Sequence, residues 1–179
     1  MTQKVAKGTF LEGNFITSSF NEKEKHFLSV DGLRPPLKFQ IENILGAVAV
    51  TSLLNVTKDD VANVATNFKG LDHRIELVRT VHGVDFVNDS KGTNVGALHK
   101  SLENFSRPII LIAGGKDKGG DFQILKIPFK KKIKHLVLIG ETKDKFREIL
   151  NGLFSYEDAE NMEDAVMRAM KKAKSGDIV

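Results

Sequence analysis

The sequence predicts an α/β protein built around a doubly wound, mostly parallel sheet. Two observations carry this prediction. From residue 75 onwards, apolar runs of strand length alternate with segments whose apolar residues recur at helical spacing. Two of the runs, 108–113 and 135–139, are apolar almost throughout, as expected of parallel strands buried on both faces. Strands that alternate with helices in this way form parallel sheets.

The composition is that of a globular protein and excludes several classes of function. The 179 residues are 41% hydrophobic and 28% charged, which suffices for a core without covalent staples. There is no cysteine, so there is neither a disulfide framework nor a thiolate site. The longest apolar run, 44–54, is interrupted by polar residues and is too short to span a bilayer. Residues 1–10 lack the apolar segment of a signal peptide, so we expect no membrane contact.

The charge pattern favours small anionic ligands over nucleic acid. The formal net charge is only +4, and much of it comes from lysine runs at 130–134 and 171–174. No aromatic residues alternate with these lysines, so the sequence offers no platform on which bases could stack. We read the runs as solvated faces and expect no nucleic acid partner.

Residues 1–70 are predicted to be the end of a domain whose beginning is absent. In order, the pattern gives a hairpin over 9–17, a strand over 26–30, an extended connection through Pro35-Pro36 and a helix over 41–54. Thr57 and Asp60 then form a capping-box pattern that opens a second helix. A few strands followed by two helices do not make a complete sheet domain. We place the boundary at the hinge-like segment 70–74.

Residues 71–179 carry the regular alternation. The predicted elements are strands over 75–81 and 84–88 joined by the turn His82-Gly83, a helix over 95–105, strands over 108–113 and 135–139, a helix over 142–150, a short strand over 153–156, and a helix that Asn161 caps. After a turn at 175–177 a new strand begins at Ile178 and the chain stops. Both ends of the sequence therefore look cut.

The first candidate site is the polar loop that follows the predicted strand 84–88. Within ten residues it holds a carboxylate, a hydroxyl, an ammonium group, an amide and two glycines. In an open parallel sheet such loops lie at the carboxyl ends of the strands, where ligands bind. The alternative is a polar turn in which Thr93 or Asn94 caps the following helix.

A second loop of similar character follows the predicted strand 108–113. Residues 114–120 hold four glycines around Lys116, Asp117 and Lys118. Glycines let the backbone approach a ligand and turn its N–H groups inward, and Lys118 can supply a positive charge to a carboxylate or phosphate. The alternative is a flexible surface turn with incidental charges. Two lysine-bearing loops at neighbouring strand ends favour a shared anion pocket.

Other kinds of site are not indicated. The Walker A pattern occurs nowhere in the sequence, so ATP phosphates would need a cradle elsewhere. None of the five histidines has metal-ligand spacing with another, so no metal site is predicted. Ser90 lacks the context of a nucleophile elbow.

Three segments together resemble the Mur ligases: Leu71-Asp72-His73-Arg74, Asn88–Gly96 and Ala113–Phe122. The string N-D-S-K-x-T-N-x-G is typical of the member that adds D-glutamate to UDP-N-acetylmuramoyl-L-alanine. That reaction belongs to peptidoglycan synthesis in the cytoplasm, and so to cell wall biogenesis, cell shape and cell division. The resemblance covers most of the chain and is strongest from 71 to 122.

The resemblance implies three domains, of which this chain holds parts of two. Residues 1–70 would be the end of the central ATP-binding domain. Residues 71–179 would be most of the Rossmann-like C-terminal domain that binds the amino acid, with its last strands missing. The family's ATP phosphate loop and Mg²⁺ ligands would lie upstream of residue 1, so the chain alone is expected to be inactive and to need the missing N-terminal and central domains.

The resemblance also implies roles for individual residues. ATP would convert the substrate carboxylate into an acyl phosphate, which the amine of D-glutamate would attack through a tetrahedral intermediate. The implied roles are catalysis by Lys91, D-glutamate binding by Thr93, Asn94 and Lys118, and nucleotide binding by Arg74, Asp89, Asn43 and Gln40. Phe39-Gln40 stands where the family usually has His-Asn.

Two alternatives remain open from the sequence. The chain could be a binding module that holds a small anion without performing chemistry, or it could belong to a sister ligase such as a folate polyglutamate ligase. Such a sister ligase would be expected to lack the string from Lys91 to Asn94.

Overall fold

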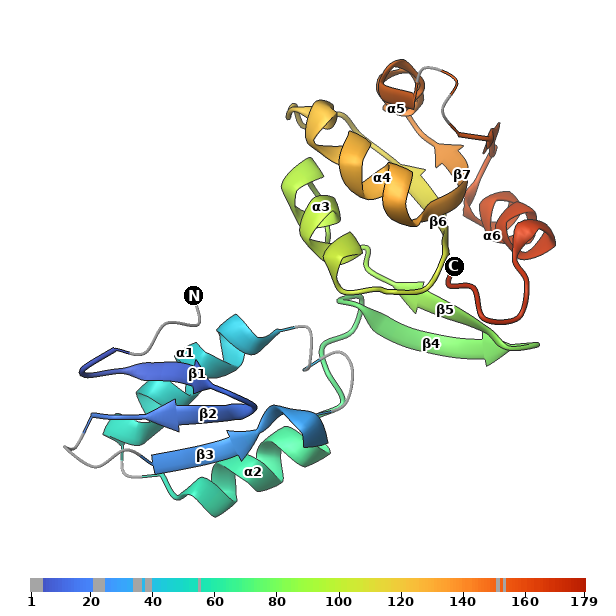
Figure 1. The fold of residues 1–179 in the computed structure, drawn as a ribbon. Helices are drawn as coiled ribbons and strands as arrows, with labels where there is room; N and C mark the ends of the chain where they lie inside the picture. The colour runs from blue at the N-terminus through green and yellow to red at the C-terminus, as the bar shows by residue number, and fades with distance from the viewer. Residues whose placement is uncertain are drawn as a thin grey trace. The chain divides into compact units, whose positions relative to one another are not determined.

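The computed structural model describes residues 5–20, 25–33, 37, 40–54, 56–150, 152 and 154–179. The chain forms two compact units, Met1–Leu71 and Asp72–Val179, which meet one residue from the predicted boundary. Figure 1 shows the elements of each unit. The predicted connection through Pro35-Pro36 and the departure at Phe39 lie outside the described residues.

The first unit is a small antiparallel sheet covered by two helices. Its strands are β1 (Thr9–Glu12), β2 (Phe15–Ser18) and β3 (Lys25–Ser29), in the order β1-β2-β3. A short 3₁₀ turn, η1 (Val30–Gly32), follows β3, and the helices are α1 (Ile41–Leu53) and α2 (Lys58–Asn67). The strands and both helices share one apolar core.

The start of α2 follows the predicted capping chemistry. The Thr57 hydroxyl oxygen accepts a hydrogen bond from the Asp60 backbone N–H at 3.2 Å, and the Thr57 hydroxyl donates to the Asp60 carboxylate at 2.5 Å. The first bond satisfies a backbone N–H that a helix start otherwise leaves unpaired, and the second joins the two side chains.

The second unit contains one mixed sheet, whose strands are β4 (Glu76–Val81), β5 (Val84–Asn88), β6 (Ile109–Gly114), β7 (Ile133–Ile139) and β8 (Tyr156–Asp158). The hairpin β4-β5 is antiparallel, whereas β6, β7 and β8 pair in parallel. The predicted turn His82-Gly83 joins the hairpin with positive φ at both residues, 50° and 77°.

The last residues of the chain join the two parts of this sheet. Ile178 bridges in parallel to Asp85 of β5 and to Ile109 of β6. Its backbone oxygen accepts from the Ile110 N–H at 2.8 Å, and the Val87 N–H donates to Val179 at 2.8 Å. Where the sequence predicted the start of a strand, the structure therefore has an isolated bridge at Ile178, which lies between β5 and β6.

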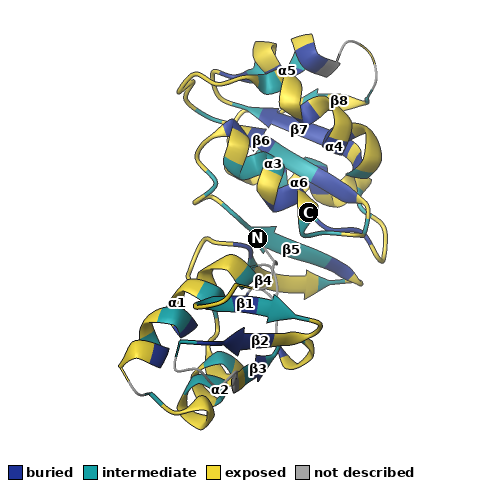
Figure 2. Ribbon diagram, turned by 60° about the vertical axis from the view of Figure 1, so that its left-hand side comes forward, coloured by how far each residue is buried: buried dark blue, intermediate teal, exposed yellow. Residues whose placement is uncertain are grey.

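Helices cover both faces of this sheet, as a doubly wound fold requires. The helices are α3 (Val95–Glu103), α4 (Lys126–Lys132), α5 (Lys143–Leu150) and α6 (Met162–Lys172). The first three share one core with the sheet, whereas α6 packs through Ala165 and Ala169 on a separate core at the other face. Figure 1 shows this division, and in Figure 2 the central strand β7 is buried.

One prediction in this unit was wrong, and two elements were missed. The short strand lies at 156–158 and not at 153–156, because Phe154 packs on Phe129 in the core while the strand itself is polar. The 3₁₀ turn η3 (Phe122–Leu125) and α4 were not predicted at all. Pro128 argues against a helix in the sequence pattern. Proline is tolerated at this position because the backbone N–H groups of the first turn have no intrahelical partner.

The two ends of the strands in this sheet form two edges with different chemistry. The carboxyl edge consists of the loops 89–94, 114–121 and 140–142, which follow β5, β6 and β7. The amino edge consists of residues at the starts of the strands, namely Asp85, Arg107, Lys134, His135 and Asp177. Among the described residues, no helix is long and apolar enough to cross a membrane.

Candidate anion-binding site

Both predicted loops line one cavity at the carboxyl edge. The cavity has a volume of about 760 Å³, and much of its lining is apolar, including Val95 and Phe122. Of the predicted site residues, those that line it are Asp89, Thr93, Asn94 and Lys118. Arg74 and Lys91 do not line it, although each adjoins a lining residue in the sequence. A few polar groups around an apolar pocket are typical of ligand sites.

The first loop is held in shape by its own backbone. The Gly92 N–H donates to the Asp89 backbone oxygen at 2.8 Å, and the Thr93 N–H donates to the Lys91 oxygen at 2.9 Å. A Cβ on Gly92 would lie 3.1 Å from both the backbone oxygen and a carboxylate oxygen of Asp89, so a larger residue would require these atoms to shift by a few tenths of an ångström. The glycine thus lets the Asp89 carboxylate fold back over the turn.

The end of this loop starts helix α3, and Asn94 caps that helix. Its side-chain oxygen accepts from the Ala97 N–H at 2.8 Å. The capping role that the sequence left open for this loop is therefore real for Asn94. Within the described part of the chain, no hydrogen bond engages the amide nitrogen of the Asn94 side chain, and the free N–H groups of the first turn carry the positive end of the helix dipole.

A strained segment before β4 is fixed to the first loop. His73 and Ile75, on either side of Arg74, have φ of 65° and 49°, in the left-handed region that a β-branched residue rarely adopts. The Ile75 N–H donates to the Asp89 carboxylate at 3.1 Å, and the Lys91 N–H donates to the His73 backbone oxygen at 3.0 Å. The first loop therefore determines where the backbone of Arg74 lies.

The second loop begins with a close approach between two strand ends. A Cβ on Gly114 would lie 1.7 Å from the Ile139 oxygen, and one on Gly140 would lie 2.8 Å from Gly115. The Gly115 N–H donates to that Ile139 oxygen at 2.9 Å. Only glycine fits this junction, which fixes the base of the loop while residues 116–120 stay exposed.

The cations of the carboxyl edge are mostly unpaired, as a site for anions requires. Within the described residues, no hydrogen bond or ion pair reaches the side-chain nitrogens of Arg74, Lys91, Lys116 or Lys118, and all four residues are exposed. The exception is Lys145 of α5, whose ammonium lies 2.5 Å from the Asp117 carboxylate. The sequence analysis did not single out Lys145, because only the fold brings α5 to this loop.

The remaining two predicted residues lie in the first unit. The side-chain nitrogen of Asn43 donates to the side-chain oxygen of Gln40 at 3.1 Å, at the start of α1. Gln40 is the N-cap residue of α1, but its side chain makes no capping bond.

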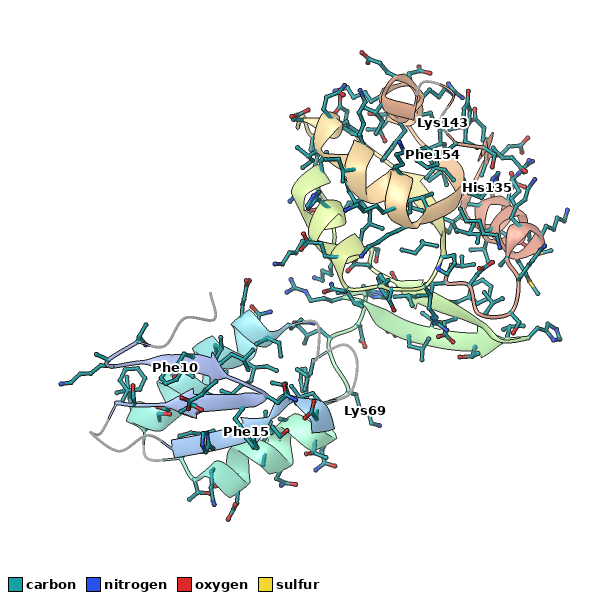
Figure 3. All side chains as sticks on the ribbon, in the orientation of Figure 1. Phe10, Phe15, Lys69, His135, Lys143 and Phe154 are labelled. Carbon is teal, nitrogen blue, oxygen red and sulfur yellow. The ribbon has the colours of Figure 1, made fainter. Side chains whose placement is uncertain are left out.

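Among the described residues, no group of three or more His, Asp or Glu side chains could hold a metal ion. His135, labelled in Figure 3, is buried on β7 at the amino edge. Its Nδ1 and the Ser155 hydroxyl are 2.8 Å apart, and burial lowers its pKa despite the nearby Glu157. It belongs to the packing of the sheet and not to the cavity.

Comparison with known proteins identifies the family. Residues 73–179 match the glutamate ligase domain of the Mur ligases. The chain belongs to the Mur ligase family. The match confirms, at the level of the family, the resemblance seen in the sequence. Mur ligases are ATP-dependent enzymes of peptidoglycan synthesis.

Individual relatives share the sequence or the fold. The UDP-N-acetylmuramoylalanine–D-glutamate ligase of Alkaliphilus metalliredigens is 38% identical over 99% of this chain, which spans 39% of that protein. A pseudomurein peptide ligase from Methanothermus fervidus has a TM-score of 0.66 at 16% identity and covers 98% of this chain and 39% of its own. Folylpolyglutamate synthase of Thermotoga maritima has a TM-score of 0.58 at 15% identity, covering 92% and 40%.

These matches confirm the predicted α/β fold class, and the structural ones carry the fold alone. The chain spans about two fifths of the length of the curated relative it matches. Within this Mur ligase chain, the match from residue 73 onwards coincides with the second compact unit.

Proposed function

We propose that the chain is part of an ATP-dependent ligase that adds D-glutamate to UDP-N-acetylmuramoyl-L-alanine in the cytoplasm. One observation carries the proposal: the loop with the string from Asn88 to Gly96 and the loop with Lys118 line the same cavity. D-glutamate carries two carboxylates, and unpaired cations beside a helix start suit such an anion. The relative from Alkaliphilus metalliredigens, which is named as a D-glutamate ligase and is 38% identical, supports this choice of amino acid.

The proposed roles follow from what each side chain offers. Thr93, Asn94 and Lys118 would bind D-glutamate, with a hydroxyl, an amide nitrogen and an ammonium group. Lys91 would stabilise charge on the transferring phosphate or on the reacting carboxylate. Bidentate contact with phosphate would suit Arg74.

The nucleotide roles are divided between the two units. One oxygen of Asp89 already accepts the Ile75 N–H, so its other oxygen would accept from ribose hydroxyls. Asn43 and Gln40 would read adenine from residues 1–71, which we take to be the end of the central ATP-binding domain. Mg²⁺ and the main phosphate loop for ATP would belong to parts of the polypeptide outside this chain, while Arg74 and Lys91 would add contacts to phosphate oxygens. We therefore expect the chain alone to be inactive.

The test uses the complete polypeptide that contains this chain. ADP release is measured with UDP-N-acetylmuramoyl-L-alanine while D-glutamate, L-glutamate and other amino acids are offered in turn. The proposal predicts release that depends on D-glutamate. Release with L-glutamate and a folate acceptor would instead indicate a sister ligase, and no release with any amino acid would indicate a non-catalytic anion-binding module.

A further inference from the structure

The ion pair between Lys145 and Asp117 lies directly beside Lys118. The ammonium of Lys145 is 2.5 Å from one oxygen of the Asp117 carboxylate. The other oxygen accepts a hydrogen bond from the Gly119 N–H at 3.0 Å. Both oxygens of Asp117 are therefore engaged. Lys118, which lies between Asp117 and Gly119 in the sequence, keeps an ammonium without a partner among the described residues.

Lys145 is held in place by the core below it. The next residue in α5, Phe146, is buried, and its ring meets the Phe122 ring edge to face at a centroid distance of 5.1 Å. The Lys145 ammonium lies 5.8 Å from the centre of the same Phe122 ring, within range of a cation–π contact. Helix α5 thus presents Lys145 to Asp117 from a fixed position.

The pairing decides which charges of the loop are available to a ligand. The hydrogen bond from Lys145, followed by that from the Gly119 N–H, holds the pKa of Asp117 below its usual value, so the carboxylate stays ionised near neutral pH. An ionised carboxylate without Lys145 would have the ammonium groups of Lys116 and Lys118 as its neighbours in the chain. Pairing with either one would cancel a charge that an anionic ligand needs.

We propose that Lys145 is a positioning residue that occupies the Asp117 carboxylate and so keeps Lys118 free for a carboxylate of the ligand. The inference deepens the proposed function and rests on it for the identity of the ligand. This role of Lys145 and a role of the pair as a simple tether of the loop predict different effects of mutation. If the pair only tethered the loop, loss of either partner would be equally harmful. If Lys145 keeps Asp117 away from Lys118, only the loss of Lys145 is harmful.

The first test is steady-state kinetics on the complete enzyme with Lys145→Ala, Asp117→Asn and the double variant. Both side chains of the pair are partly exposed, 45% and 36%, so the expected effect is moderate. Lys145→Ala should raise the KM for D-glutamate about fivefold, the upper range for such a pair, and leave the KM for ATP unchanged. Asp117→Asn, which keeps the acceptor for the Gly119 N–H, should leave the KM for D-glutamate close to that of the unaltered enzyme, and the double variant should resemble Asp117→Asn.

The second test does not depend on turnover. An ammonium paired with a carboxylate loses its proton less readily, so it reacts more slowly with an acylating reagent. Acetic anhydride labelling, read by mass spectrometry, should show slower modification of Lys118 in Lys145→Ala and recovery in the double variant. Lys130, exposed on α4, is the internal control.

The two tests separate the inference from the proposed function. Absence of D-glutamate-dependent ADP release in the unaltered enzyme would refute the proposed function, while the labelling would still test the inference. An Asp117→Asn variant as impaired as Lys145→Ala, or Lys118 labelling that does not change, would overturn the inference and leave the proposed function intact.

Discussion

The two edges of the sheet in residues 72–179 use charged side chains in opposite ways. At the amino edge, the carboxylates of Asp85 and Asp177 are 22% and 7% exposed, and each is paired with a cation. At the carboxyl edge, Lys91 and Lys118 are exposed and have no partner among the described residues. Removing one partner of a largely buried pair is destabilising because it leaves the other charge unpaired, whereas unpaired cations repel one another until an anion binds.

The difference shows that charged side chains stabilise the fold at the amino edge and are available to a ligand at the carboxyl edge. Arg107 pairs with Asp85 and Lys134 pairs with Asp177, and both carboxylates flank the bridge that Ile178 makes in the middle of the sheet. The pairs at the amino edge therefore hold the Ile178 bridge between β5 and β6 in place. The carboxyl edge is shaped by backbone hydrogen bonds and glycines instead, which leaves its side chains free.

The largest effect is expected at the carboxyl edge, from Lys91→Ala in the complete enzyme. Loss of one group that stabilises developing charge typically lowers kcat about 10²- to 10³-fold. The melting temperature should not change, because the Lys91 side chain has no partner within the described structure. Lys130→Ala, which removes another exposed lysine, is the matched control. A kcat within a factor of a few of the unaltered enzyme would remove Lys91 from the site.

At the amino edge, Asp177→Asn should reduce stability and not binding. The carboxylate accepts hydrogen bonds from the Lys134 ammonium and, at 2.7 Å, from the Lys174 N–H. Losing a charged partner of this kind costs about 1–3 kcal/mol. Hydrogen exchange at the Ile110 amide, which donates to Ile178, is the local readout and should become faster. A raised KM for D-glutamate without faster exchange would contradict the division between the edges.

The same variant should change the pH dependence. Burial alone would raise the pKa of Asp177, but the bonds from Lys134 and Lys174 outweigh it and hold the pKa below the ordinary value of 3.8. A carboxylate whose pKa is lower in the folded than in the unfolded protein stabilises the fold at pH values above its ordinary pKa. This stabilisation is lost as the pH falls through the pKa of the folded state. The protection of the Ile110 amide should therefore differ between the two proteins at pH 7 and converge in acid. A constant difference down to pH about 2 would show that the charge is not the cause.

The smallest effect is expected from Asn94, which belongs to the carboxyl edge yet serves the structure. Loss of its cap in Asn94→Ala should destabilise α3 by about 1 kcal/mol, and Asn94→Ser should retain most of the stability. Thermal unfolding of both variants separates the cap from a ligand contact. Because serine lacks the amide nitrogen, a raised KM for D-glutamate in Asn94→Ser at unchanged stability would assign that nitrogen to the ligand.

The sequence was sufficient for the regular elements and for the two loops. Periodicity predicted the strands that become β5, β6 and β7, and local chemistry predicted the caps at Thr57 and Asn161 and the turn at His82-Gly83. These features depend on neighbouring residues alone, so single-sequence patterns reveal them.

Features that depend on distant residues were missed. Lys145 reaches Asp117 only after α5 packs beside the loop, and nothing in its own segment indicates that contact. Helix α4 was hidden by Pro128, and the polar strand β8 is defined by its pairing with β7 and not by its own composition. The left-handed φ of Ile75 is likewise imposed by the contact with Asp89.

The most direct test of the account is the KM for D-glutamate of Lys118→Ala beside Lys130→Ala in the complete enzyme. We expect Lys118→Ala to lower kcat/KM for D-glutamate about 10- to 100-fold, the range for a charged hydrogen bond, with unchanged ATP saturation and melting temperature. Lys130→Ala should match the unaltered enzyme. Equal D-glutamate dependence in both variants would show that the carboxyl edge is not the amino-acid site.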